Sequence, residues 1–356
     1  MYEELVKRNE KIIEAVIHKA EKVCPGSLAL IGISGSFQNG DIYDKSDLDL
    51  LILINDDRGW QLGATFIQKD LMVGHDIYCT KWDALEEHAK YEAPNIAKLM
   101  DSKIVYCADE KYRKRLEDLR MQVKTKLEQP FNKEDYDKAY KQFKEAKVEF
   151  CNLIISDKEN EVLSCVGKML YFLGNTVAMI NKKYFKRSVK RCLDEIQGME
   201  NVPKNFCENV QKIVATRELT DIKEIATKLI QSVEETFKQL NIQLSSTKEL
   251  PSASNLTGTY EEMFSNWRNK MYHAIDLENR YLAFMSLVSL EGMLSDISEE
   301  VKIGEYEVYS AYDPDDLLKT AKAFDGILNQ YLENYKVASM KVNEYPNIDV
   351  FIKNYR

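Results

Sequence analysis

The sequence predicts an α+β fold in three parts: a small mixed-sheet domain at residues 1–110, a helical bundle domain at 111–243, and a mostly helical C-terminal extension at 244–356. Three observations support this division. Short apolar runs of strand length alternate with short helical segments over the first 110 residues. From residue 109 to 240, nearly every segment has the hydrophobic period of a helix. Residues 244–258 are rich in Ser, Thr and Asn, as linkers are.

Within the first part, hydrophobic spacing and turn residues indicate the elements in order. Apolar residues recur at helical spacing over 3–23, and Pro25-Gly26 ends this helix. A short buried strand over 28–33 leads into a Gly-Ser turn, and the apolar segment 47–54 is predicted to be a second strand. The other elements expected here are a helix near 59–69, a strand at 71–80, a helix at 82–91 and a strand at 103–107.

The rest of the chain is predicted to be helical with short connections. Residues 109–240 contain successive amphipathic segments separated by turns such as those at Gly198 and Pro203. After the linker, helices are expected near 259–274, 277–298 and 314–336, with an extended piece around 302–312. This pattern is typical of a helical bundle followed by a second helical segment, whose role the sequence leaves unknown.

The charge balance disfavours a general nucleic-acid binder. The chain of 356 residues has a formal net charge of -9, and its 44% hydrophobic content is ordinary for a globular protein. Nucleic-acid binders normally carry a basic face that neutralises phosphates. An acidic chain suits a cationic small-molecule partner instead. Length and charge leave the oligomeric state open.

Cysteine usage and the N-terminus predict a cytoplasmic protein without a membrane segment. The seven cysteines are odd in number and include no C-x-x-C pair, which is typical of reduced thiols. The first 23 residues are charged throughout, unlike a signal peptide. No apolar run approaches the roughly 18 residues of a bilayer span. The four histidines lack metal-ligand spacing, so no zinc site is expected.

The segment from Ile33 to Ile54 carries the clearest functional pattern. Gly35-Ser36 is followed, after ten residues, by Asp47-x-Asp49 at the head of an apolar run. Alternate residues of a strand point to one face, so the two carboxylates should lie on the same side. The Gly-Ser turn offers backbone N–H groups and a hydroxyl to an anion. Together these residues predict a site for a metal-bound triphosphate.

A third carboxylate is expected from the next strand, where Asp76 lies within a run of strand-forming residues and His75 should point to the opposite face. Directly opposed residues on paired strands lie about 4.5–5.5 Å apart at Cβ, near enough to share a metal pair. Nucleotidyl transfer needs charge compensation at the α-phosphorus and at the departing pyrophosphate. Two Mg²⁺ ions roughly 3.5–4 Å apart supply it, held by carboxylates.

The pattern Gly35-Ser36, Asp47-x-Asp49 and Asp76 resembles the minimal nucleotidyltransferases of the DNA polymerase β superfamily. The specific match covers residues 28–107. The helical domain after residue 110 makes the chain similar to antibiotic nucleotidyltransferases of the kanamycin, streptomycin and lincosamide type. The segment after 245 has no counterpart in this resemblance.

The resemblance implies a role for each matched residue. Gly35 and Ser36 would hold the β- and γ-phosphates of ATP or another nucleoside triphosphate. Asp47 and Asp49 would bind the pair of Mg²⁺ ions. Asp76 would ligate the catalytic metal, deprotonate the acceptor hydroxyl, or do both. The implied reaction moves AMP from ATP to a hydroxyl of a small molecule, with an aminoglycoside-type antibiotic as the best single candidate.

Two lysines are further candidates for phosphate contact. Lys45 comes just before the first aspartate, where it either touches phosphate or is an ordinary solvated loop lysine. Lys183 belongs to the densest basic cluster, at residues 181–191. This cluster either faces the triphosphate from the helical domain or forms a solvated helix end, where cations favour the helix dipole.

Two other functions stay open at this point. An antitoxin-like nucleotidyltransferase would modify a protein or a tRNA. Its local support is Arg268 and His273, which match the short Arg-x4-His pattern of HEPN-type ribonucleases. A nucleotide-binding regulatory protein without turnover is the other alternative, motivated by the unassigned segment 244–356.

Overall fold

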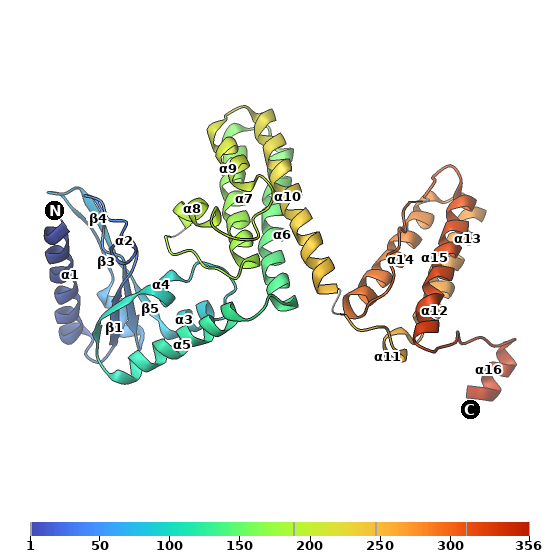
Figure 1. Cartoon of the computed structure of the whole chain (residues 1–356), viewed down its shortest axis with the longest axis horizontal. Helices are drawn as coiled ribbons and strands as arrows, with labels where there is room; N and C mark the ends of the chain where they lie inside the picture. The colour runs from blue at the N-terminus through green and yellow to red at the C-terminus, as the bar shows by residue number, and fades with distance from the viewer. Residues whose placement is uncertain (1, 188, 246–247, 311, 356) are drawn as a thin grey trace. The chain divides into compact units, whose positions relative to one another are not determined.

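The computed structural model describes residues 2–187, 189–245, 248–310 and 312–355. It divides into two compact units, Met1–Leu240 and Asn241–Arg356, shown in Figure 1. Each unit has a hydrophobic core of its own. The N-terminal part holds a mixed four-stranded sheet with helices, and the remainder is mainly helical, so the predicted α+β class is confirmed.

The first unit begins with the sheet and the helices that cover it. Its elements up to residue 128 are, in chain order, α1 (Tyr2–Val23), β1 (Leu28–Ile33), α2 (Ser36–Asn39), β2 (Leu50–Ile54), η1 (Asp57–Leu62), β3 (Ala64–Gln68), β4 (Val73–Ile77), β5 (Cys79–Lys81), α3 (Trp82–Ala89), α4 (Ala97–Asp101), β6 (Lys103–Cys107) and α5 (Glu110–Glu128). The four-stranded sheet has the order β5-β2-β1-β6, and β3 and β4 form a separate two-stranded sheet. In the larger sheet only the β2–β5 pairing is parallel.

Strand β2 is buried on both faces, which explains its continuous apolar sequence. Leu50, Ile52 and Ile54 pack in the core that contains the apolar face of α1. Leu51 and Leu53 point the other way, into the core formed with α3, α4 and α5. Figure 1 shows α1 and α5 on opposite sides of the sheet. Each fully buried leucine or isoleucine contributes about 1.5–3 kcal/mol, so β2 anchors the residues just before it.

The second half of this unit is a helical bundle that shares one core with α3, α4 and α5. Its elements are α6 (Lys133–Ile155), α7 (Glu159–Ile180), η2 (Val189–Arg191), α8 (Cys192–Ile196), α9 (Phe206–Ala215) and α10 (Leu219–Ser245). Every residue of α7 from Leu173 to Ile180 is buried. Within the described residues, α7 is also the one helix long and apolar enough to cross a bilayer, and 56% of its apolar window is buried inside the structure. A central core helix has the same composition.

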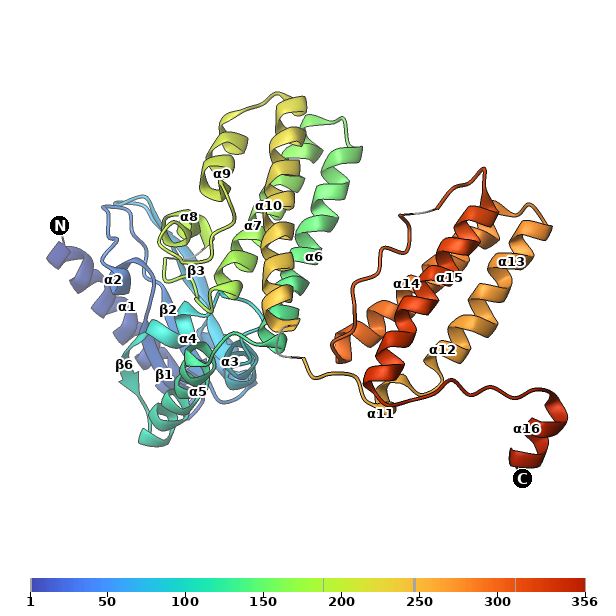
Figure 2. The same ribbon diagram turned by 45° about the vertical axis from the view of Figure 1, so that its right-hand side comes forward.

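The C-terminal unit is built from helices around its own core. Figure 2 shows the long helices α14 and α15 of this unit lying next to α13. Phe324, Leu328 and Tyr331 of α15 are buried in this core, with Leu287 and Leu290 of α14. The elements are α11 (Ala253–Leu256), α12 (Thr259–Glu262), the π-helical η3 (Met263–Arg268), α13 (Asn269–Asp276), α14 (Arg280–Glu300), α15 (Leu317–Val337) and α16 (Ile348–Tyr355).

Two predicted elements of the first domain are wrong. The helix expected near 59–69 is a 3-10 turn, η1, followed by strand β3. The run Ala64–Gln68 contains Thr, Phe and Ile, which favour a strand once β4 offers backbone pairing. The single strand expected at 71–80 is divided into β4 and β5, which belong to different sheets.

Candidate functional site

The candidate site is built around the turn that joins β1 to α2. Gly35 has a φ of +65°, a backbone region that glycine adopts at low cost. A Cβ atom added to Gly35 would lie 1.8 Å from Oδ2 of Asp49. The backbone N–H of Ser34 also donates to the carbonyl of Asp49, at 2.9 Å. The turn and the Asp49 carboxylate therefore hold each other in place.

Ser36, the next residue of the turn, presents a hydroxyl without a partner. Its Oγ is buried and forms no hydrogen bond with any of the described residues. Leaving a buried hydroxyl unsatisfied costs about 1–3 kcal/mol. A ligand with an acceptor oxygen, such as a phosphate, would satisfy it.

Asp47 and Asp49 lie in the extended residues directly before β2, and not within the predicted strand over 47–54. Leu48 between them is only 3% exposed. Because side chains alternate along an extended chain, both carboxylates point away from the core on the same side, as the sequence predicts. Burial raises the pKa of Asp49, and the negative charge of Asp47 raises it further. A bound cation beside the carboxylate would oppose this rise in pKa.

The loop before the carboxylates is fixed by contacts with distant residues. Arg8 of α1 donates from Nη2 to the carbonyl of Ser46 at 2.8 Å. The hydroxyl of Ser46 accepts from the N–H of Tyr43 at 3.0 Å. Asp41 forms an ion pair with Arg191 from the helical part of the unit. These contacts position Asp47 without using its carboxylate.

The turn and both carboxylates line one cavity of about 700 Å³. The rest of its lining comes from α2 and the loop before β2, from α4 and the residues just before it, from α7 and from the segment after α7, so the sheet and the helical bundle of the first unit both contribute. Asn95 donates to the hydroxyl of Tyr171 at 3.1 Å across this lining. The lining residues are Ser34, Gly35, Ser36, Asn39, Asp41, Tyr43, Ser46, Asp47, Asp49, Asn95, Ala97, Lys98, Tyr171, Phe185, Lys186, Arg187, Lys190 and Arg191.

Four exposed cations of this lining are not held in close ion pairs with other described residues. Lys98, Lys186, Arg187 and Lys190 form no ion pair within the described ranges, which omit 188 and five other positions. The positive charges of Lys98 and Lys190 oppose the rise in the pKa of Asp49, so these two lie within electrostatic reach of the carboxylate. A cavity with two adjacent carboxylates and several unpaired cations suits a ligand that carries both a metal ion and anionic groups.

Asp76 does not join the other two carboxylates in this structure. Its strand, β4, pairs with β3, where Asp76 is opposite Thr65. The neighbour of β2 is β5 instead, so the expected pairing of Asp76's strand with that of Asp47 and Asp49 is wrong. The Asp76 side chain is exposed and does not line the cavity, while His75 is buried on the other face, as predicted. Its catalytic role stays a prediction.

The two predicted phosphate-binding lysines lie outside the cavity lining. Lys45 is exposed in the loop before Asp47. Lys183 lines a neighbouring cavity of about 640 Å³, and its backbone carbonyl accepts from the hydroxyl of Tyr91 at 2.6 Å. Their role in phosphate binding is a prediction that these positions do not favour. Two other members of the basic cluster, Lys186 and Arg187, line the cavity with the carboxylates, and Lys186 lines the neighbouring cavity as well.

Sequence reasoning missed the contribution of α4 and α7 to the cavity. Asn95, Lys98 and Tyr171 stand in ordinary helical or loop sequence, with no motif around them. Pro94 marks only a helix boundary there. Nothing local in the sequence shows that these residues lie next to the Gly35 turn.

The residues present are suited to hold magnesium with a nucleotide. Mg²⁺ usually retains several waters and is bound by one or two carboxylates together with substrate phosphates. Asp47 and Asp49 supply two carboxylates, and the unpartnered Ser36 hydroxyl adds a donor for phosphate. Within the residues that the structure describes, no group of three or more His, Cys, Asp and Glu side chains could hold a metal. The fit therefore depends on the phosphates as further ligands.

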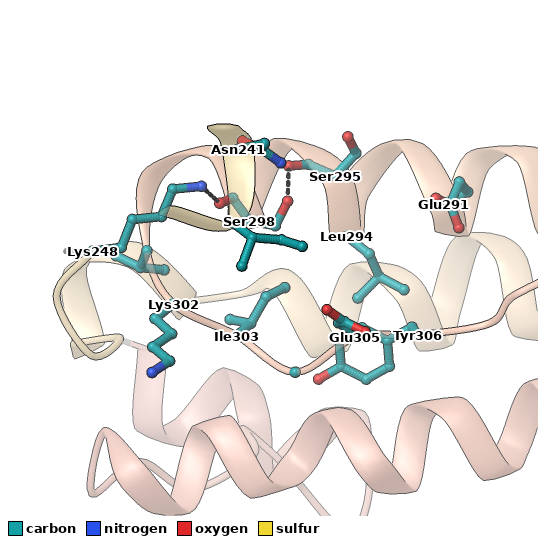
Figure 3. Close-up of a pocket in the computed structure, with 13 residues that line it drawn as sticks. Asn241, Lys248, Glu291, Leu294, Ser295, Ser298, Lys302, Ile303, Glu305 and Tyr306 are labelled. Atoms are coloured by element: carbon teal, nitrogen blue, oxygen red, sulfur yellow. Dashed lines mark hydrogen bonds between the residues drawn. The ribbon is translucent and has the colours of Figure 1, made fainter. Parts of the chain in front are cut away.

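A second cavity, of about 500 Å³, lies in the C-terminal unit (Figure 3). Lys248 donates to the carbonyl of Ser298, and the hydroxyl of Ser298 donates to the carbonyl of Ser295 at 2.7 Å. Lys248 and Ser298 thus both donate to backbone carbonyls within the unit. This cavity contains none of the residues that the sequence predicts for chemistry.

Arg268 and His273 have different surroundings in the structure. The Nε of Arg268 lies 2.6 Å from Oδ1 of Asp325, and the hydroxyl of Tyr272 donates to Oδ2 of the same carboxylate at 2.6 Å. The guanidinium also stacks on the rings of Phe264 and Tyr272. His273 is exposed. Arg268 therefore links η3 and α13 to α15.

Comparisons with known proteins add little to this geometry. No protein-family model and no curated protein matches the chain. Among solved structures, a nucleotidyltransferase-like protein from Exiguobacterium sibiricum 255-15 is similar, with 11% sequence identity and a TM-score of 0.35. The match covers 64% of this chain and 74% of that chain. A likeness of this degree assigns neither an activity nor a substrate to this chain.

Proposed function

We propose that this protein is a Mg²⁺-dependent nucleotidyltransferase that moves AMP from ATP to a hydroxyl of a small molecule. The observation that supports it most is the convergence of the Gly35-Ser36 turn, Asp47, Asp49 and unpaired cations on one cavity. The sequence pattern of the turn and the two aspartates points to the same chemistry independently.

Each group has a role that its chemistry suits. The backbone of Gly35 and the free hydroxyl of Ser36 would bind phosphate oxygens. Asp47 and Asp49 would hold magnesium, which when bound supplies positive charge to the phosphate oxygens. Lys98 and Lys190, which line the same cavity, would neutralise the remaining phosphate charge.

The reaction transfers one group between two oxygens. The acceptor hydroxyl oxygen forms a bond to the α-phosphorus, and the bond from that phosphorus to the oxygen of the β-phosphate breaks. Its electron pair leaves with pyrophosphate, and the hydroxyl proton is lost to water. The protein's contribution is to hold the two oxygens in line and to stabilise the departing charge.

The first experiment measures ATP binding by calorimetry and pyrophosphate release with a panel of hydroxyl compounds. The panel includes aminoglycosides and lincosamides, because the sequence resemblance makes them the first acceptors to try. We expect Asp49→Asn and Asp47→Asn each to lower turnover by about 100-fold or more, since each removes a charged ligand. Asp44→Asn is the matched control, because Asp44 is exposed on the same loop and does not line the cavity. It should change turnover less than about twofold.

The same assay separates this proposal from its alternatives. Magnesium-dependent ATP binding without pyrophosphate from any acceptor would favour a regulatory protein without turnover. Labelled AMP that appears on a protein or an RNA in a lysate would favour a macromolecular acceptor. Absence of ATP binding would contradict the proposed site altogether.

A further inference from the structure

The side chain of Arg8 connects α1 to the loop that carries Asp47. Its Nη2 donates to the carbonyl of Ser46 at 2.8 Å, and this carbonyl belongs to the peptide group that joins Ser46 to Asp47. Ser46 is only 1% exposed. Because a peptide group is planar, the N–H of Asp47 is oriented together with that carbonyl. Arg8 therefore fixes the backbone from which the Asp47 carboxylate extends.

The guanidinium group of Arg8 is itself held in place by the next residue of α1. Oδ1 of Asn9 accepts from Nε at 3.1 Å and from Nη2 at 2.9 Å. Asn9 is only 3% exposed. The planar guanidinium cannot turn away from the Ser46 carbonyl without losing its hydrogen bonds to Asn9 as well. Residues behind a metal site commonly orient the groups that bind the metal in this way.

Helix α1 is a rigid support for this contact. Ile13 and Val16 of α1 are buried in the same core as Leu50 and Ile52 of β2. The helix that carries Arg8 and the strand that begins just after Asp49 are therefore fixed to each other by packing. The short segment between Ser46 and Leu50 is thus held at both of its ends.

One nitrogen of the Arg8 side chain is an unsatisfied donor. Nη1 is buried and has no hydrogen-bond partner among the described residues. An unpaired buried donor lowers stability, and such groups in folded proteins call for an explanation. A methionine would fill much the same space without this cost. The presence of arginine is explained if its fork is needed at the Ser46 peptide, since local rules are broken mainly at functional sites.

The two carboxylates of the site are positioned by different elements. The backbone of Asp49 accepts from the N–H of Ser34 at the end of β1, and its side chain fills the space beside Gly35. The backbone next to Asp47 is held by Arg8 of α1 instead. Loss of the Arg8 side chain should therefore disturb Asp47 while it leaves Asp49 and the Gly35 turn in place.

From these contacts we infer that Arg8 is a positioning residue for metal binding, which holds Asp47 where its carboxylate can bind the magnesium ion of a bound nucleotide. The inference rests on the proposed function and deepens it, because it adds a residue of α1 to the machinery of the site. Arg8 does not line the cavity. It acts through the Ser46 peptide group.

The test compares nucleotide binding with and without magnesium. The full chain is titrated by calorimetry with α,β-methylene-ATP, in which the bond that would break is replaced by a stable one, first in Mg²⁺ and then in EDTA. The ratio of the dissociation constant in EDTA to that in Mg²⁺ is the metal gain. We expect Arg8→Met to lower the metal gain by about tenfold, as loss of groups behind metal ligands does. The affinity in EDTA should change less than about twofold.

Two further variants accompany Arg8→Met. Lys7→Met is the matched control, because Lys7 precedes Arg8 on α1 and is exposed, and it should keep the metal gain within about twofold. Arg8→Lys keeps the positive charge but replaces the fork by one ammonium group, so we expect a loss of about threefold in the metal gain. If Arg8→Met fails to fold, seen as loss of helical circular dichroism, Arg8→Lys decides the question, and an unchanged metal gain in it would contradict the inference.

A double-mutant cycle tests whether Arg8 acts through Asp47. Asp47→Asn removes the charged ligand that Arg8 is inferred to position. In that background Arg8→Met should lower the affinity for the analogue in Mg²⁺ by less than about twofold further, because residues that act as a unit have non-additive effects. Additive losses would show that Arg8 does not work through Asp47.

The outcomes separate this inference from the proposed function. If the unmodified chain does not bind the analogue in Mg²⁺, the proposed function is contradicted and the inference with it. If the chain binds the analogue but Arg8→Met behaves like Lys7→Met, only the inference is wrong. The same conclusion follows if Arg8→Met weakens binding equally in Mg²⁺ and in EDTA, which is the result of a merely structural role.

Discussion

At the scale of single residues, the site depends on the contact between Gly35 and Asp49. The Asp49 carboxylate occupies the space that a side chain at Gly35 would fill. Gly40, five residues later, also has a positive φ, of +71°, but has no heavy atom within 4 Å of an added Cβ. Substitutions at the two glycines can therefore be compared to separate two free-energy costs. One is the cost of the backbone conformation, and the other is the cost of displacing the carboxylate.

Replacing Gly35 by alanine should reduce both stability and nucleotide binding. We expect the free energy of unfolding to fall by about 2–4 kcal/mol, from backbone strain and from the clash with Asp49. Urea denaturation measures the first effect, and calorimetry with Mg²⁺ and ATP the second. Gly40→Ala should cost only about 1 kcal/mol and leave binding unchanged. Equal effects of the two substitutions would argue against a special role for the Gly35 contact.

Local sequence was sufficient to identify the residues that are close together along the chain. Gly35, Ser36, Asp47 and Asp49 all line the cavity, because a turn and an extended segment position them with their immediate neighbours. Local sequence did not show which cations of the basic cluster line the cavity. The basic cluster at 181–191 was evident, yet Lys183 faces another cavity, because the path of the chain after α7 decides which side chains face the carboxylates.

At the scale of elements, strand pairing decides where Asp76 lies. Each paired residue of β2 has its partner 27 positions later, as in Ile52 with Cys79 and Ile54 with Lys81. The same offset would bring Asp49 opposite Asp76. The pairing stops short of that point, and Asp76 pairs with Thr65 in the small sheet instead. The sequence predicted the strand-like character of this region, but not which strand it would join.

Helix α6 and the turn that follows α7 are joined by an ion pair that tests the packing of the bundle. Nζ of Lys182 lies 2.6 Å from Oδ2 of Asp135, with only 9% and 16% of the two side chains exposed. Lys182→Met would leave the largely buried Asp135 carboxylate without its cation. We expect a loss of about 3 kcal/mol in the free energy of unfolding, measured by urea denaturation.

An exposed ion pair on the same helix provides the comparison. Lys133 and Asp137 lie 2.9 Å apart with about half of each side chain exposed. Lys133→Met should cost less than about 1 kcal/mol. A loss of similar size in both variants would mean that burial of the Lys182 pair does not matter to stability.

At the scale of the whole molecule, net charge is unevenly divided between the two units. Residues 241–356 contain eleven Lys and Arg against eighteen Asp and Glu, which accounts for most of the net charge of -9. The cavity of the first unit, in contrast, has a cationic wall. The total charge of a chain is therefore a poor guide to the charge around one cavity within it.

Because each unit has its own core, we expect two transitions in calorimetric unfolding of the full chain. Mg²⁺ and ATP at about 100 times the dissociation constant should stabilise the first unit by roughly 2.7 kcal/mol. That corresponds to a shift of roughly 5–10 °C in one transition, with the other unchanged. Asp49→Asn should abolish the shift. A single transition, or two that shift together, would contradict independent units.

The sequence by itself determined the α+β class, most of the helices, and the turn and aspartates of the candidate site. Hydrophobic period, turn residues and short-range spacing are local properties, so they can be recognised in the sequence without knowledge of the fold. The tertiary structure alone decided that β5 and not β4 flanks β2, that α4 and α7 help to form the cavity, and which cations line it. Those relations join residues far apart in the chain, and their free energy comes from packing and pairing that appear only once the chain has folded.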